Sequence, residues 1–268
     1  MLGRSGDLVM CNQRIGEAAT LAVAFTVISL AAPNASRAAD CPVSHEQLAN
    51  ALKASVKASG GPSNGGFDTH QWASVVTRDG TVCAVAFSGN KPDDQWPGSR
   101  VVAMAKANTA NAFSVNQMAL STANLFAPAQ PGQSLYGIVQ AGPPSPEANV
   151  GDSAQFGTPS DPALGKRIGG TVVFGGGLAL YSEGGVIGGI GVSGDTSCAD
   201  HNVAWRVRQA LGLNKTPQKD AIVYDLGPDG KSASGFGHVK CPGHEADVAH
   251  ELGAGVGGYS LSGLTPGK

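Results

Sequence analysis

The sequence has no surplus of charge of either sign. Among its 268 residues, 18 Lys and Arg stand against 20 Asp and Glu, which gives a formal net charge of −2. Charged residues make up only 14% of the chain, and the basic ones are scattered. A nucleic-acid-binding protein usually carries a basic stripe. We therefore expect no nucleic-acid partner.

The sequence also lacks the common catalytic and metal-binding motifs. Ser193 lies in Gly-Val-Ser-Gly, which is not the G-x-S-x-G turn of a hydrolase. The pair His244-Glu245 does not continue to H-E-x-x-H, because Val248 occupies the position of the second histidine. The close spacing of His238, Cys241, His244 and His250 resembles a zinc cluster. Because Cys241 has a predicted disulfide role and the surroundings resemble a loose tail, we predict structural or disordered histidines and no metal.

A run of about 20 apolar residues, the length of a membrane-spanning helix, is absent as well. The longest uncharged run near the start, Ala18–Ala32, has fifteen residues and follows two arginines. Ser36-Arg37-Ala38 then resembles a signal cleavage site. We therefore predict that residues 1–39 are a secretory signal cut after Ala38. The mature protein is expected to be periplasmic or extracellular, with no membrane contact after cleavage.

Cysteine is scarce, with five in the chain, and Cys11 falls within the predicted signal. The remaining four, an even number in an oxidising compartment, suggest two disulfides out of three possible pairings. We favour Cys41–Cys83 and Cys198–Cys241, each joining a core element to the segment beyond it. Buried free thiols are the alternative.

The first half of the mature chain predicts a helix and a β-hairpin. Ser44 and Gln47 form a capping-box pattern for a helix over 44–59. Strands at 72–78 and 81–87 flank Asp79-Gly80, a strong hairpin signal. Both faces of this hairpin are apolar, so we expect it to be covered on both sides in a layered domain. One face is predicted to carry Trp72, Val76, Cys83, Val85 and Phe87, and the other Ala73, Val75, Val82, Ala84 and Ala86.

The rest of the chain predicts a second hairpin between two helices. Residues three or four apart in a helix share a face, and an alanine-rich helix is predicted over 99–113. The second hairpin is formed by 178–182 and 186–192, followed by a helix capped by Ser197 and Asp200 that ends at Gly212. The remaining segments are a surface loop over 127–167 with one strand at 135–140, a strand at 221–224, and a tail from Gly253 that is predicted to be disordered.

Glycine is abundant between Gly169 and Gly191, inside and between the two strands of the second hairpin. Glycine weakens a strand, so such clustering indicates close approach to another backbone, a tight bend or a flat ligand. Gly189–Gly194 matches G-x-G-x-x-G, but a dinucleotide site needs an acidic residue about 20 residues further on. Asp225 lies 36 residues after Gly189. A close-packed turn is therefore favoured over a nucleotide site.

Two polar side chains on the alanine-rich helix, Lys106 and Thr109, are the strongest candidates for a site. Their structural alternative is an exposed lysine and a threonine bonded back to its own helix. The stretch Lys106-Ala107-Asn108-Thr109-Ala110 resembles the K-A-x-T-A signature of the GlcG/HbpS-like haem-binding family. Further matches in the same order are Gly175–Leu180, a variant of that family's G-G-x-P-[IL] strand, then Gly188–Gly194 and Asp200.

The resemblance implies an α+β, profilin-like fold, with an antiparallel sheet, helices packed on both faces, and frequent homo-oligomers. It also implies haem binding in some members. Thr109 falls where a haem-contacting threonine sits, and Lys106 is nearby. A threonine ligand would be weak, because haem iron usually prefers His, Cys, Met or Tyr. The sequence departs from the family at Ala179, which replaces the proline, and at Gly89-Asn90-Lys91, which replaces an acidic segment.

We therefore expect three parts: the signal over 1–39, a GlcG/HbpS-like domain over 40–212, and a C-terminal extension over 213–268. The leading hypothesis is an exported protein for haem capture or sensing, with weak haem or peroxide chemistry as an option. Thr109 would lie near the iron, Lys106 near a propionate and Phe113 against the porphyrin. The predicted haem-contacting set is Thr109, Lys106, Phe113, Gly189, Gly191 and His201.

Two other functions remain open. The same pocket would serve a small-molecule enzyme in which Lys106 or His201 acts as acid or base. The chain would otherwise be a non-catalytic module whose glycine strands pack against a neighbouring subunit.

Overall fold

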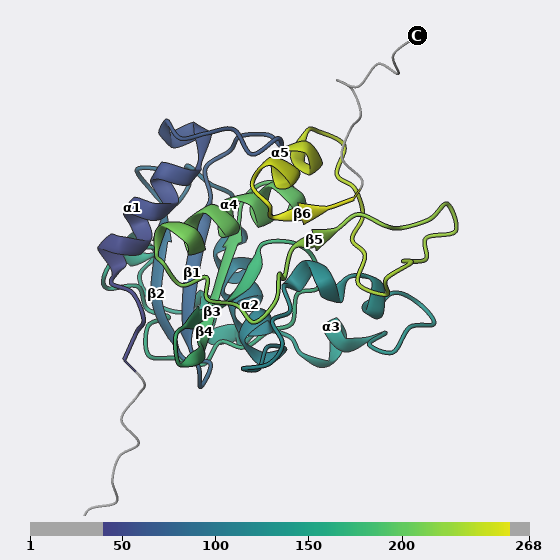
Figure 1. Ribbon diagram of the computed structural model, residues 1–268. Helices are drawn as coiled ribbons and strands as arrows, with labels where there is room; N and C mark the ends of the chain where they lie inside the picture. The colour runs from purple at the N-terminus through teal and green to yellow at the C-terminus, as the bar shows by residue number, and fades with distance from the viewer. Residues whose placement is uncertain (1–39, 258–268) are drawn as a thin grey trace, which may run out of the picture. The chain divides into compact units, whose positions relative to one another are not determined.

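A four-stranded antiparallel sheet lies at the centre of the structure, a computed structural model that describes residues 40–257 (Figure 1). The strand order is β2-β1-β4-β3. The strands are β1 (Trp72–Thr77), β2 (Val82–Phe87), β3 (Gly177–Ser182) and β4 (Gly185–Ser193). Both predicted hairpins are confirmed, because β1 pairs with β2 and β3 pairs with β4. The predicted signal peptide lies outside the described residues.

Helices cover both faces of this sheet. α1 (His45–Ser55) contacts β2, and α4 (Ser197–Ala210) contacts β3 and β4, on the near side in Figure 1. α2 (Ser99–Ala112) packs against β1, β3 and β4 from the far side. The predicted α+β class with helices on both faces is confirmed.

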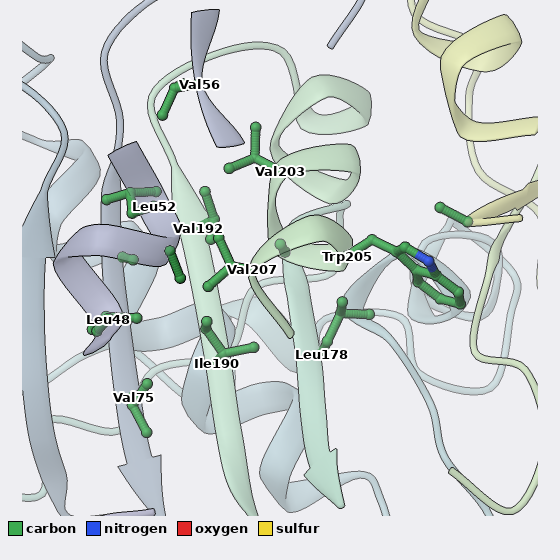
Figure 2. Packing of buried hydrophobic residues seen from close by; sticks show 14 of the residues in the cluster. Leu48, Leu52, Val56, Val75, Leu178, Ile190, Val192, Val203, Trp205 and Val207 are labelled. Carbon is green, nitrogen blue, oxygen red and sulfur yellow. The ribbon is translucent and has the colours of Figure 1, made fainter. Parts of the chain in front are cut away.

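The main apolar core fills the space between the sheet and the pair α1 and α4. Leu48 and Leu52 of α1 and Val203 and Val207 of α4 point into it (Figure 2). Ile190 of β4 and its neighbours meet them from the sheet, and all are buried. The i, i+4 spacing of the two leucines and of the two valines places each pair on one helix face.

A β-bulge in β2 reverses two of the predicted facings. The register passes from Val75 opposite Ala84 to Val76 opposite Val82, which leaves Cys83 as the extra residue. Val82 therefore packs with the α2 side of the sheet and Cys83 with the α1 side, opposite to the prediction. A bulge inserts one residue and so shifts the alternation of side chains. It brings Cys83 to the face where Cys41 lies, and the two form a disulfide.

The helix caps are partly as predicted. Ser44 and Gln47 form the capping box of α1. α4 is capped by Thr196, whose hydroxyl accepts from the Ala199 amide, and not by Ser197. Asp200 is not a capping partner of Ser197, because its carboxylate accepts from the Asp195 amide and from Lys106.

Both edges of the sheet are occupied in part by the chain's own backbone. At β2, the Val82 amide donates to the Lys166 carbonyl at 2.8 Å, and the Gly165 amide donates to the Val82 carbonyl at 2.9 Å. At β3, the Tyr181 amide donates to the Leu213 carbonyl at 3.0 Å. Neither edge is therefore a continuous open strand.

The segment between α2 and β3 consists mainly of loops and short helices. The strand predicted at 135–140 is wrong: Gly137 adopts a positive φ of 85° and begins a short helix instead. The short helices of this segment are η2 (Thr122–Leu125), η3 (Ala127–Ala129), α3 (Ile138–Ala141), η4 (Pro146–Asn149) and η5 (Ser153–Gln155). One more short helix, η1 (Lys57–Ser59), lies between α1 and β1.

The C-terminal segment folds against α4. β5 (Ile222–Val223) pairs in parallel with β6 (Gly255–Val256), and α5 (Glu245–Glu251) contacts α4. A disulfide between Cys198 and Cys241 ties this segment to α4, so both disulfides follow the favoured pairing. The prediction of disorder from Gly253 is wrong for residues 253–257, which include β6 and pair with β5 through backbone hydrogen bonds. The rest of the predicted tail, from 258 onward, lies outside the described residues. Within residues 40–257 no helix is long and apolar enough to cross a membrane.

Candidate functional site

The glycines of β4 allow α2 to lie directly on the sheet. A Cβ added to Gly191 would come within 2.0 Å of the Ala103 carbonyl oxygen and 2.5 Å of the Ala107 amide nitrogen. At Gly189 the nearest atom would be the Ala107 carbonyl oxygen, at 2.3 Å. The close neighbour of these strands is therefore the backbone of α2, with no separate ligand or subunit required. Gly189 and Gly191, two predicted haem contacts, are buried beneath the helix.

Lys106 crosses from α2 to the helix layer on the opposite side of the sheet. Its Nζ lies 2.6 Å from the Asp200 carboxylate on α4 and donates to the Val192 carbonyl at 3.0 Å. Lys106 is 0% exposed and Asp200 is 1% exposed. The glycines before β3 provide the space, because a Cβ at Gly176 would lie 2.7 Å from the Lys106 Nζ. The ion pair therefore connects the two helix layers of the fold.

Burial sets the protonation behaviour of this pair. Desolvation raises the pKa of Asp200 to about 6, although the Lys106 charge works in the opposite direction. Desolvation also lowers the pKa of Lys106, again opposed by Asp200. Removing charges from water disfavours the charged form of each group. Each charge is thus held by its partner.

A short segment, Gly170–Phe174, lies over the α2 face that carries Lys106 and Thr109; we name it the strap. The Gly170 carbonyl accepts from the Asn108 side-chain amide at 2.9 Å. The Val172 amide donates to the Thr109 hydroxyl oxygen at 2.9 Å. The Phe174 ring lies over the Lys106 Nζ, 4.9 Å from it, and is itself 38% exposed. The strap therefore separates both predicted site residues from solvent.

The Thr109 hydroxyl is already engaged in hydrogen bonds within the protein. Its hydroxyl donates to the Ala105 carbonyl of its own helix at 2.7 Å and accepts from the strap, and the residue is 1% exposed. Haem binding requires space for the porphyrin ring beside the protein and a side-chain atom that is free to ligate the iron. The α2 face under the strap does not fit haem, and it would do so only after the strap has left.

The two remaining predicted haem contacts, Phe113 and His201, do not lie on the α2 face beneath the strap. Phe113 caps the C-terminal end of α2 and is half-buried. His201 lies in α4, fully buried, with Nε2 3.2 Å from the Ala254 carbonyl oxygen. Burial lowers the pKa of His201 to about 3, so it is neutral at physiological pH. Lys106 and Thr109 share one helix face, whereas His201 belongs to the packing of α4 against the C-terminal segment.

Sequence reasoning missed the residues that close this face. The strap, with Phe174 at its end, lies in the glycine-rich stretch of the sequence. A loop that covers a helix has no periodic sequence pattern, so the sequence does not predict it. The sequence predicts no role for His238 in closing this face. This histidine accepts a hydrogen bond from the Gly175 amide, immediately after the strap, and its ring is tilted against the Phe126 ring with the centroids 5.0 Å apart. Within residues 40–257 no group of three or more His, Cys, Asp or Glu is placed to hold a metal.

An antiparallel sheet between helix layers, with a buried lysine on an alanine-rich helix, defines the class of protein. The family described as "Haem degrading protein HbpS-like" matches residues 46–208. The chain belongs to this HbpS-like family, and haem binding is supported at the level of the family. The C-terminal segment from 213 lies beyond the match.

Three of the solved structures that are similar to this chain have the following identity and coverage. The crystal structure of a PduOC–heme complex is 24% identical, covering 64% of this chain and 94% of its own, with a TM-score of 0.44. The protein ORFY of Klebsiella pneumoniae is 24% identical over 63% of this chain and 88% of its own, with a TM-score of 0.43. HbpS is 21% identical over 63% and 90%, with a TM-score of 0.40. No curated protein matches the chain.

Proposed function

We propose that this protein is an exported haem-binding protein, and that haem binds the α2 face of Lys106 and Thr109 when the strap is displaced. The observation that carries the proposal is the closure of this face by one short segment. The family signature residues lie side by side on α2, and the strap covers them through hydrogen bonds with Asn108 and Thr109 and the ring of Phe174 over Lys106. The strap is also held by the Thr122 hydroxyl, which donates to the Phe174 carbonyl at 2.6 Å, and by its own Thr171 amide, which donates to the Gly142 carbonyl at 2.8 Å. A neutral hydrogen bond contributes about 1 kcal/mol net, so displacement of the strap is expected to cost several kcal/mol and only a small fraction of the molecules should be open.

The first consequence concerns the kinetics of binding. A site that must open binds its ligand with an affinity reduced by the fraction of open molecules. Haemin should therefore associate slowly with the wild-type protein, and loosening the strap should speed association. Phe174→Ala removes the ring that covers Lys106 and is expected to raise the association rate severalfold. Phe67→Ala, a truncation of an exposed phenylalanine outside the strap, is the matched control.

The experiment is a haemin titration followed through the Soret band. A saturable shift at a fixed ratio per chain supports haem binding, and a flat titration contradicts it. Thr109→Ala with unchanged affinity and spectrum would remove Thr109 from the site while leaving haem binding itself intact. Equal association rates for Phe174→Ala and Phe67→Ala would contradict the role of the strap.

Export is the second part of the proposal. It is supported by the predicted signal and by the pairing of all four remaining cysteines, since disulfides persist mainly in oxidising compartments. Fractionation of the native host should recover the protein outside the cytoplasm, with an N-terminus near residue 39. Recovery of an uncleaved cytoplasmic chain would contradict export.

A further inference from the structure

Two exposed apolar side chains of the C-terminal segment and one from the stretch that follows α2 line a common cleft. This cleft has a volume of about 290 Å³ and lies between the stretch that follows α2 and the segment containing β5 and β6. Met118, Phe236 and Val256 line it and are 49%, 42% and 45% exposed. Clustered exposed apolar side chains mark ligand or partner sites more often than single ones do.

Small side chains keep the interior of the cleft open. Ala119 and Ala221 line it and are 1% and 4% exposed, so they form its buried part. Gln218 fixes the two sides to each other, because its side-chain amide donates to the Ala119 carbonyl at 2.7 Å. The volume lies at the lower end of the range of small-molecule sites, about 300–1,000 Å³. The cleft therefore suits a compact apolar group.

One cation accompanies this apolar lining. Lys219 is a lining residue, is exposed, and has no ion-pair partner among residues 40–257. The acid next to it in sequence, Asp220, is buried and held by Arg208 at 2.6 Å. Lys219 is thus an uncompensated positive charge beside an apolar cleft, which complements a ligand with an apolar body and an anionic end.

We propose that this cleft binds a small amphipathic carboxylate, with its hydrocarbon part against Met118, Phe236 and Val256 and its carboxylate near Lys219. The site is independent of the proposed haem site. None of its lining residues belongs to the face of Lys106 and Thr109, and the residues from Gln218 to Val256 lie beyond the family match.

The probe is octanoate, titrated calorimetrically into the purified protein, with 1-octanol as its uncharged counterpart. We expect saturable binding of one octanoate per chain. In a series of shorter acids, the affinity should fall about fourfold for each methylene removed. Val256→Trp should fill the cleft and weaken octanoate binding at least about tenfold, since the burial of the acyl chain is lost. Val150→Trp, at an exposed valine outside the cleft, is the matched control. No octanoate binding, or equal binding by both tryptophan variants, would overturn the site.

The carboxylate preference is tested at Lys219. Lys219→Gln should weaken octanoate binding about three- to fivefold, as for an exposed ion pair, and leave 1-octanol unchanged. Lys53→Gln in α1 is the control and should change neither. Equal effects of Lys219→Gln on the acid and the alcohol would overturn the carboxylate assignment. Loss of haemin binding in Val256→Trp would show that the cleft is the haem site and overturn its independence.

Discussion

Lys106 shows how one side chain links parts of the fold that are far apart in sequence. It starts on α2, passes the glycines before β3, and ends on the Asp200 carboxylate of α4. A charge buried in this way is tolerated only because its partner is present. The family signature lysine is therefore a structural element of this chain, and its predicted position near a propionate stays a prediction.

The first prediction concerns a variant that removes one charge of the Lys106–Asp200 pair. Lys106→Met leaves the Asp200 carboxylate buried without its cation, which typically costs about 3–5 kcal/mol of unfolding free energy. The double variant Lys106→Met/Asp200→Asn removes both charges and should recover much of the loss. Urea unfolding at pH 7.5 measures both. A double variant as unstable as Lys106→Met would show that the packing of the lysine stem matters more than its charge.

The second prediction concerns the hydroxyl of Thr109. Thr109→Val keeps the side-chain volume but leaves the Val172 amide of the strap without its acceptor. An unpaired buried group costs about 1–3 kcal/mol, so the unfolding free energy should fall by that amount. Thr109→Ser retains the hydroxyl and serves as the control. Amide hydrogen exchange at Val172 should accelerate in Thr109→Val alone, and equal exchange in both variants would contradict the contact.

At the scale of elements, the contact between α2 and β4 dominates the architecture. Alanines on the helix and glycines on the strand allow the two backbones to approach so closely that a Cβ atom at Gly191 or Gly189 would collide with the Ala103 or Ala107 carbonyl oxygen. Interiors are close-packed, so such an interface tolerates almost no added atom. Gly189 and Gly191 are thus explained by helix-on-sheet packing.

The third prediction tests this packing. Gly191→Ala places a methyl group within 2.0 Å of the Ala103 carbonyl oxygen, so α2 must shift. Overpacking costs about 1–3 kcal/mol, and a further loss is expected because backbone atoms, not flexible side chains, must move. Gly184→Ala in the β3–β4 turn meets only the Ser182 hydroxyl at 4.0 Å and is the control. Similar thermal midpoints for the two variants would contradict the assigned role of Gly191.

The regular elements were predictable from the sequence, and the covering segments were not. The hairpin at Asp79-Gly80 and the Ser44 cap depend on local rules, and both hold in the structure. The strap depends on contacts between residues far apart in sequence, such as the hydrogen bond from the Val172 amide to the Thr109 hydroxyl. The spacing of apolar residues does not predict such contacts. The bulge at Cys83 likewise shifts the alternation by one residue, a change that the apolar character of both faces conceals.

At the scale of the whole molecule, acid stability depends on two buried histidines. His201 and His238 are almost completely buried, and desolvation is the largest cause that lowers their pKa values, to about 3 and about 4. Both are neutral in the folded state at a pH where the unfolded chain binds protons. Their contribution to stability is therefore complete above about pH 6.5 and is lost as the pH falls toward 4 and 3.

The fourth prediction follows from these signs. Asp200, with its pKa raised to about 6, opposes the histidines, because between pH 6 and 4 the folded state binds a proton that the unfolded state lacks. Near pH 5 the net uptake on unfolding is about one proton, so stability should fall by about 1.4 kcal/mol per pH unit. Urea unfolding from pH 7 to 4.5 measures this slope. His238→Gln should reduce or reverse it, whereas His244→Gln at an exposed histidine should not. Identical slopes in the two variants would contradict the assignment.

The backbone contacts along the two sheet edges restrict how copies of this protein can assemble. An open edge strand invites another strand to pair with it, and here Lys166 beside β2 and Leu213 beside β3 already occupy part of each edge. Growth of a sheet from one copy into the next would require these segments to detach. If copies of this chain associate, helix and loop surfaces are therefore the expected contacts, and the same coverage of the edges protects the chain against strand-mediated aggregation.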